Sequence, residues 1–456
     1  MSSFTLSLAG LAAGLSFRDL SPVAIGWANR AFADTVGCAL AGVGEEVLQK
    51  VSSVVPGNLG PAMTFGEARR LHPLDAAQLN GVAAHALDFD DCNMEMDGHP
   101  SVSIVPALLA LGDQLDSNGE DLLVAYVAGL EAEIRLARVS NPAHADRGWH
   151  PTVTFGVIGA AIACGRLLRL DALQMATAIG IAASSAAGLR ANSGTMTKPF
   201  HAGQANRNGL QAALLAQAGM TANQGVLEHR FGFMACFGGA VPEGPELVLE
   251  NWAQDFALLS PGLAIKQYPC CAFVHCAIDA AAELHTLVDV AQISEIRVVL
   301  HRKRLKNIDR PRPKDGLDAK FSTQYLTARA LIDGTVTLED FSAARVFDPG
   351  CAALSQLVQI IPHEAADLSS ATVRLCLTDG RMLDASASVA MGRGPANPMT
   401  EAQFATKFLD CAAVSLSKDR AKTLLGALLD LPAQRSVRRL TAMMQPIAAL
   451  EAALTE

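Results

Sequence analysis

The sequence has few aromatic residues and few charges. Only 5% of its 456 residues are Phe, Trp or Tyr and 18% are charged, whereas half are apolar. A chain of this length can bury a large core and form two domains. With so few rings, that core must consist mainly of Ala, Leu, Val and Ile. The formal net charge of −9 argues against nucleic acid or an anionic membrane as the main partner.

Signals for secretion, membrane insertion and zinc binding are missing as well. No apolar run reaches the roughly 18 residues that a membrane-spanning helix needs, and "MSSFTLSLAGLAAGLSF" has no basic residues ahead of its apolar part. The ten cysteines are scattered and do not follow paired C-x-x-C spacing. We therefore expect a cytoplasmic protein with reduced thiols, no membrane partner and no metal site.

Several catalytic motifs are also absent. The chain has no G-x-G-x-x-G after a strand, no G-x-x-x-x-G-K-[ST], no G-x-S-x-G and no H-E-x-x-H. Their absence disfavours a nucleotide cofactor, hydrolysis by an elbow serine and zinc peptidase chemistry. Acid–base chemistry by carboxylate, imidazole, lysine and phenol groups remains.

The pattern of apolar residues changes along the chain. Up to residue 265, stretches such as "SPVAIGWANRAFADTVGCALAG" follow helical spacing and are rich in small residues. "ISEIRVVLHRK" then predicts a strand, and "ATVRLCLTDGRMLDASASV" predicts a hairpin around Asp379-Gly380. After "GRGPANPMT" the helical pattern returns. We expect a mainly α protein: an all-helical domain (1–265 and 396–456) and a smaller α+β lid domain (266–395), with a ligand in the cleft between them.

Two apolar helices are expected to open with the same phrase, His-Pro-Ser at His99 and His-Pro-Thr at His150. Proline suits the first helical turn, and Ser101 and Thr152 are placed to cap the free N–H groups. A helix N-terminus attracts carboxylates and favours a neutral histidine that can act as a base. The alternative is that the two His-Pro pairs only mark loops and have no functional role.

"HALDFDD" places three aspartates at the end of a predicted helix. Asp88 and Asp91 are spaced to share a helical face, with Asp90 pointing elsewhere. Carboxylates are disfavoured at a helix C-terminus, so the group requires a lysine, a substrate or a metal as partner. The alternative is a solvated acidic turn.

Two further segments gather polar groups. In "GTMTKPFHAGQANRNG", Lys198 is predicted in a loop, followed by His201, in a small cationic cluster. In "KQYPCCAFVHCAID", Lys266 and His275 flank cysteines whose spacing fits packing better than zinc. "KFSTQY" supplies Tyr325, one of three tyrosines, on a predicted helix.

Taken together, these motifs resemble the MmgE/PrpD family, which includes 2-methylcitrate dehydratases, cis-aconitate decarboxylases and iminodisuccinate epimerase. The resemblance covers nearly the whole chain, in the right order, through "HALDFDD", "GHPS", "GWHPTVTFG", "GTMTKPFHAG", "KQYPCC", "KFSTQY" and "GRGPANPMT". It implies a helical domain with an α+β lid, a homodimer, and an active site between the domains that uses neither metal nor cofactor.

The resemblance also implies the site. The catalytic positions that match are Asp88, His99, His150, Lys198, His275 and Tyr325, and we expect Ser101, Thr152, Lys198, His201 and Lys266 to bind substrate. Lys198 and the helix starts would hold a carboxylate, and His99 or His150 would be the base. Asp88 would orient or polarise an imidazole, and Tyr325 and His275 are candidates for the opposing acid.

One stretch departs from the family. Its dehydratases and decarboxylases often have Thr, an aromatic residue or His after the paired aspartates, where this chain reads "DDCNMEMDG". We therefore expect an epimerase or isomerase of an amino- or imino-dicarboxylate. The alternatives are a lyase, either a 2-methylcitrate dehydratase or a cis-aconitate decarboxylase, and a non-catalytic helical scaffold. A scaffold would not need six polar motif positions.

Overall fold

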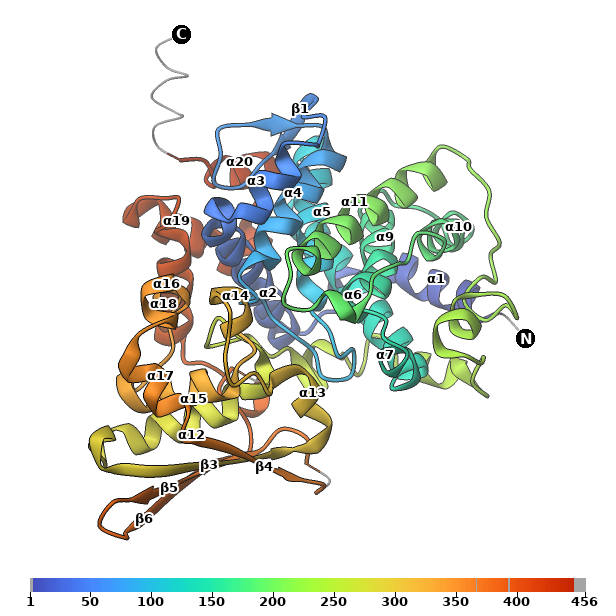
Figure 1. The fold of residues 1–456 in the computed structure, drawn as a ribbon. Coiled ribbons are helices and arrows are strands. Elements are labelled where there is room, and N and C mark those ends of the chain that lie inside the picture. Colours follow the sequence, from blue (N-terminus) through green and yellow to red (C-terminus); the bar gives the residue numbers. More distant parts are fainter. Residues whose placement is uncertain (1–2, 366, 393, 447–456) are drawn as a thin grey trace. The chain divides into compact units, whose positions relative to one another are not determined.

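The computed structural model describes residues 3–365, 367–392 and 394–446 (Figure 1). The chain forms two compact units, unit 1 within Met1–Ile265 and Thr400–Glu456 and unit 2 within Lys266–Met399. Helices dominate, so the predicted mainly α class is confirmed. No helix in the described ranges is both long enough and apolar enough to cross a bilayer.

Unit 1 consists of helices and one small antiparallel strand pair. Its first helices are α1 (Phe4–Gly14), α2 (Pro22–Ala41), α3 (Glu46–Ser52), α4 (Pro73–Ala86), α5 (Pro100–Leu115), α6 (Gly119–Ser140), α7 (Ala143–Asp146), α8 (Pro151–Thr154), α9 (Gly156–Leu167), α10 (Ala172–Ala183) and α11 (Thr197–Gln217). The chain returns to unit 1 with α18 (Glu401–Ala412), α19 (Lys418–Leu429) and α20 (Val437–Ala442). Strands β1 (Leu59–Met63) and β2 (Arg70–Leu71), which pair with each other, were not predicted.

Helix α11 packs against α4, α5, α9 and α10, and two of its glycines explain how closely. A Cβ atom at Gly203 would lie 2.6 Å from the Gln78 carbonyl oxygen in α4. One at Gly209 would lie 2.8 Å from the Val157 carbonyl oxygen in α9. The small residues predicted to allow close helix packing therefore lie where the backbones approach, and they bring the start of α11 near α4.

Unit 2 is a four-stranded sheet with helices. The strand order is β4 (Val358–His363), β3 (Ile293–His301), β5 (Ala371–Leu377) and β6 (Met382–Ala387), with β3 parallel to β4 and antiparallel to β5. The helices are α12 (His275–His285), α13 (Leu305–Ile308), α14 (Gly316–Ala319), α15 (Thr323–Asp333), α16 (Ala343–Val346) and α17 (Pro349–Ser355). Helix α12 packs on β5 and β6 and against α15, and Figure 1 shows both helices along one face of the sheet.

The hairpin predicted at Asp379-Gly380 is confirmed. Strands β5 and β6 flank it, and Gly380 has a φ of +88°. Every second residue of β5 is buried, because one face of the sheet carries the core of unit 2. The strand predicted from "ISEIRVVLHRK" is β3, whereas its parallel neighbour β4 was missed.

Candidate active site

The two His-Pro helix starts of unit 1 lie side by side. His99 precedes α5 and His150 precedes α8, each with proline as the first helical residue. The His99 backbone N–H donates to the Thr152 hydroxyl at 3.1 Å. A Cβ atom at Gly98 would lie only 3.0 Å from the Thr152 nitrogen, so the close approach favours glycine there.

The predicted capping by Ser101 and Thr152 is wrong, because neither helix start has a side-chain cap. Thr152 accepts from His99 instead. Ser101 donates its N–H (3.2 Å) and its hydroxyl to Asp91, and its hydroxyl lies 2.7 Å from the Tyr126 hydroxyl. Burial, and then the charge of Asp34, raises the pKa of Asp91 to about 8. Asp91 thus fixes the first turn of α5.

Asp88 is buried beside an ammonium group and an imidazole. Helix α4 ends at Ala86, and Asp88 takes a left-handed conformation with a φ of +53°. Its Oδ1 accepts from Lys198 Nζ at 2.7 Å and lies 3.4 Å from His99 Nε2. Of the three partners that the sequence left open for these aspartates, a lysine is therefore present.

Lys198 does not lie in a loop, as was predicted, but in the first turn of α11, with 11% of its side chain exposed. The helix starts at Thr197, and close packing of α11 on α4 carries Lys198 to Asp88. Arg207, a further cation of the segment "GTMTKPFHAGQANRNG", pairs with Asp75, so the cationic cluster predicted there is partly neutralised.

Asp90, which was predicted to point elsewhere, lies at the centre of the group. Because the chain leaves the helix before Asp88, helical spacing does not apply to these aspartates. His85 Nδ1 lies 2.9 and 3.0 Å from the two Asp90 oxygens. His99 Nδ1 lies 3.1 Å from Asp90 Oδ2. The side chains of His85 and Asp90 have no exposed surface.

Four histidine rings form a continuous row. The ring centroid of His85 lies 4.5 Å from that of His99 and 6.4 Å from that of His150. At the far end, Nδ1 of His150 lies 3.0 Å from Nδ1 of His201, so one of these nitrogens donates and the other accepts. The predicted residue His201 therefore joins this group.

Burial governs the charges in this row. It is the main cause that lowers the pKa of His85 and of His201 to about 4, and with Lys198 it holds the pKa of His150 well below its ordinary value. These three imidazoles are neutral at pH 7. Burial would raise the pKa of Asp90, but the His85 and His99 imidazoles lower it well below the usual range, so Asp90 is a carboxylate.

Four of these side chains could together hold a metal ion, although the sequence predicted none. One ligand atom from each of His85, Asp88, Asp90 and His99 lies within 4.8 Å of all the others. The ammonium of Lys198 already takes one oxygen of Asp88, and His85 contacts both oxygens of Asp90. A cation would have to compete with these bonds.

The other predicted residues belong to unit 2. Lys266 and His275 are buried, and His275 Nε2 lies 3.3 Å from the Cys270 carbonyl oxygen. The Tyr325 hydroxyl donates to the Asp340 carbonyl oxygen, and burial raises the pKa of Tyr325. Unit 1 thus brings together Asp88, His99, His150, Lys198 and His201, with Thr152 between the two helix starts. The contribution of the three residues of unit 2 stays a prediction.

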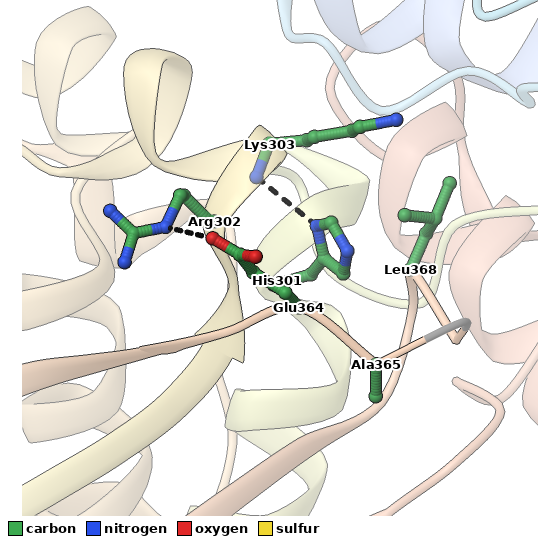
Figure 2. A pocket seen from close by; sticks show the side chains of 6 residues that line it. All are labelled: His301, Arg302, Lys303, Glu364, Ala365 and Leu368. Atoms are coloured by element: carbon green, nitrogen blue, oxygen red, sulfur yellow. Dashed lines mark hydrogen bonds and ion pairs between the residues drawn. The ribbon is translucent and has the colours of Figure 1, made fainter.

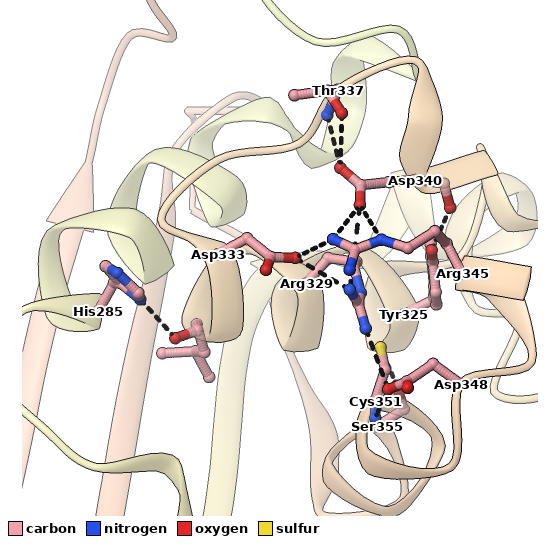
Figure 3. A network of polar contacts seen from close by, with 11 residues as sticks. His285, Tyr325, Arg329, Asp333, Thr337, Asp340, Arg345, Asp348, Cys351 and Ser355 are labelled. Atoms are coloured by element: carbon pink, nitrogen blue, oxygen red, sulfur yellow. Dashed lines mark hydrogen bonds and ion pairs between the residues drawn. The ribbon is translucent and has the colours of Figure 1, made fainter. Parts of the chain in front are cut away.

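A buried arginine surrounded by acids lies next to Tyr325 (Figure 3). The Arg329 side chain is 1% exposed and lies 2.9 Å from Asp333 and 3.3 Å from Asp348. Arg345 joins the group through Asp340 at 2.7 Å. This network fixes α15 and the segment after it, and so fixes Tyr325.

Unit 2 also contains a hollow of about 600 Å³ at one end of β3 and β4 (Figure 2). It is lined by His301, Arg302, Lys303, Glu364, Ala365 and Leu368. Arg302 pairs with Glu364 at 2.8 Å. No predicted site residue lines this hollow.

Sequence reasoning missed His85 and identified Asp90 only to set it aside. Both stand in "HALDFDD", five residues apart, and the motif was the available signal. The contact between Asp90 and His85 could have been predicted only if the end of the helix before Asp88 had been recognised.

A buried set of carboxylate, imidazole and ammonium groups is typical of the active site of an acid–base enzyme. The chain belongs to the MmgE/PrpD family. The MmgE/PrpD N-terminal domain matches residues 6–243 and the C-terminal domain matches residues 268–431. The family predicted from the motifs is confirmed.

The relatives of this chain are enzymes. Cis-aconitate decarboxylase of Mus musculus is 30% identical over 93% of this chain and 90% of its own length, and that of Homo sapiens is 29% identical over 93% and 91%. The mitochondrial 2-methylcitrate dehydratase of Yarrowia lipolytica is 26% identical over 80% and 75%. This chain is likewise an enzyme, an isomerase or lyase of the family. These relatives favour the lyase alternative over the predicted epimerase.

Proposed function

We propose that this protein is an acid–base lyase of a small di- or tricarboxylate, and that its reaction is decarboxylation of a cis-aconitate-like acid. The observation that carries the proposal is that three functional groups are gathered in one part of unit 1. The bond between His99 and Thr152 holds the two His-Pro helix starts, and so His99 and His150, together, and Lys198 and His99 both contact Asp88. The decarboxylases that align over nine-tenths of the chain support this choice of substrate.

Lys198 is suited to hold a substrate carboxylate. Its ammonium carries a positive charge and three N–H donors, one of which binds Asp88. The side chains of Lys198 and His99 are 11% and 12% exposed, whereas those of His85 and Asp90 have no exposure. A substrate therefore meets Lys198 and His99 first, with the other groups behind them.

His99 is suited to deliver a proton. Decarboxylation breaks the carbon–carbon bond to one carboxylate, releases CO₂ and leaves an electron pair that must receive a proton on carbon. The ring of His99 lies between Asp90 at Nδ1 and Asp88 at Nε2, and two carboxylates stabilise a protonated imidazole. In the substrate complex, Nε2 would give up its proton to carbon, while Lys198 neutralises the remaining carboxylate.

Dehydration of a 2-methylcitrate-like acid is the second candidate, supported by the relative in Yarrowia lipolytica. That reaction removes a proton from carbon and expels hydroxide, which leaves as water after protonation. His150 is held neutral and can take the proton. His99 would then protonate the leaving hydroxyl. The epimerase stays a prediction that rests on "DDCNMEMDG".

The test is an assay of purified protein with cis-aconitate and 2-methylcitrate, recording both CO₂ release and absorbance near 240 nm. CO₂ release from cis-aconitate, lost in His99→Gln and Lys198→Met, would support the decarboxylase. No CO₂ from cis-aconitate, with growing absorbance from 2-methylcitrate, would replace it by the dehydratase.

The homodimer and the cytoplasmic location are further parts of the proposal. The homodimer rests on the family resemblance, and the location rests on the ten scattered cysteines, which suit a reducing compartment. Sedimentation of the purified protein tests the first, with a monomer at micromolar concentration as the contrary result.

A further inference from the structure

We propose that Asp90 is a positioning residue of this site: shared between His85 and His99, it fixes the proton on Nδ1 of His99 and turns Nε2 toward Asp88 and Lys198. The inference rests on the proposed function for its consequence in catalysis. Its structural content concerns the two rings alone.

The geometry around Asp90 favours one arrangement of protons. Its two oxygens lie 2.9 and 3.0 Å from His85 Nδ1, and Oδ2 lies 3.1 Å from His99 Nδ1. A carboxylate has no hydrogen to donate, so contacts this short are favourable only when each Nδ1 carries a hydrogen. Asp90 therefore accepts a hydrogen bond from His85. At Nδ1 of His99 it makes an ion-pair contact without a well-aligned hydrogen bond, and its negative charge there favours a hydrogen on that nitrogen.

His85 completes the pattern. A neutral ring with its hydrogen on Nδ1 has a bare lone pair on Nε2, and His85 Nε2 is buried with no hydrogen-bond partner among the described residues. Leaving that atom unsatisfied costs stability. The cost is tolerated here while Asp90 binds the opposite side of the ring.

Asp90 is the nearer of the two carboxylates that flank the ring of His99. The contact of His99 Nδ1 with Asp90, at 3.1 Å, is shorter than that of Nε2 with Asp88, at 3.4 Å. Asp88 is also bonded to Lys198 at 2.7 Å. Nε2 is thus the nitrogen that can exchange a proton with substrate, and Asp90 acts through it without touching the reacting atoms.

The direct test is the position of the hydrogen on each ring. Protein labelled with ¹⁵N-histidine is studied by long-range ¹H–¹⁵N correlation NMR, with signals assigned from His85→Asn and His99→Asn. Both Nδ1 atoms should carry hydrogen in the unsubstituted protein. A bare Nδ1 in His99 overturns the proposal, and this reading requires neither substrate nor an Asp90 variant.

The variant Asp90→Asn supplies the second arm. Asparagine removes the negative charge, so His99 loses one of the two carboxylates that stabilise its protonated ring. We expect kcat to fall about 10–100-fold, as for other carboxylates that orient a functional histidine, with a smaller change in KM. Asp90→Glu should recover part of this loss.

The matched control is Asp91→Asn, the next buried aspartate, which binds Ser101 rather than a histidine. It should leave Nδ1 of His99 protonated. An Asp90→Asn protein that folds, keeps both rings unchanged and keeps kcat would show that Asp90 only supports the fold. A failure of the lyase assay leaves the NMR result valid, so the two proposals fail separately.

Discussion

The backbone N–H of His99 donates to the hydroxyl of Thr152 at 3.1 Å, and this bond joins the first turns of α5 and α8. Both groups lie in the part of unit 1 that contains the imidazoles of His99 and His150 and the ammonium of Lys198. The repeated His-Pro phrase therefore marks two neighbouring segments of one site.

Replacing Thr152 with Val should remove the acceptor for the His99 N–H and leave that donor unsatisfied. We expect a loss of about 1–3 kcal/mol in the free energy of unfolding. We also expect a drop in kcat/KM beyond the loss of folded protein, because His99 would no longer be held against α8. Urea denaturation and steady-state kinetics measure both. Thr152→Ser keeps the hydroxyl and should behave as the unsubstituted protein; equal losses in Ser and Val variants would contradict this role.

Lys198→Met should weaken both stability and turnover. The substitution leaves the carboxylate of Asp88 buried without this ammonium, which costs about 3–5 kcal/mol for a broken buried pair. Loss of the charged bond to substrate should lower kcat/KM by roughly 10–150-fold. The double variant Asp88→Asn/Lys198→Met should regain stability but not activity. An active single variant would remove Lys198 from the site.

The extent of sequence prediction differs between these features. Proline at the helix starts and Asp379-Gly380 in the hairpin were readable because their causes lie within a few residues. The Lys198–Asp88 pair joins residues 110 positions apart, and its burial depends on how closely α11 packs on α4. Ser101 was predicted to cap the helix because its actual partner, Asp91, lies outside the helix and is not indicated by the helical pattern. Asp90 was misplaced because helical spacing was extended past Ala86, where the helix ends.

His144 gives a pH dependence with a defined sign. It lies 2.7 Å from the Thr154 hydroxyl and against the ring of Phe155, and burial lowers its pKa to about 3. Its pKa in the unfolded chain is about 6.5. Below that pH the unfolded chain binds a proton that the native protein does not, so His144 contributes a loss of stability as pH falls toward 3.

The variant His144→Phe should therefore gain stability relative to the unsubstituted protein by about 1.4 kcal/mol per pH unit as the pH falls below 6.5. Above pH 7 the difference between the two proteins should be constant. Urea denaturation from pH 7.5 to 4.5 measures it. A difference that does not change with pH would show that His144 titrates normally.

Treatment with EDTA should leave kcat/KM unchanged. His85, Asp88, Asp90 and His99 lie close enough to bind a metal ion, but Lys198 already neutralises Asp88 and the two imidazoles already contact Asp90. Activity that disappears on chelation and returns with added Zn²⁺ or Mn²⁺ would overturn the acid–base mechanism.

The most direct test of the lyase is product analysis of cis-aconitate turnover in D₂O, by ¹H and ¹³C NMR with CO₂ collected. The decarboxylase is expected to release one CO₂ per substrate and to place one deuterium on a carbon of the product, because the proton delivered by His99 comes from solvent. The contrary result is an active protein that releases no CO₂, forms no new double bond from any di- or tricarboxylate, and exchanges one hydrogen beside a carboxylate for deuterium. That outcome would contradict the lyase and establish the epimerase instead.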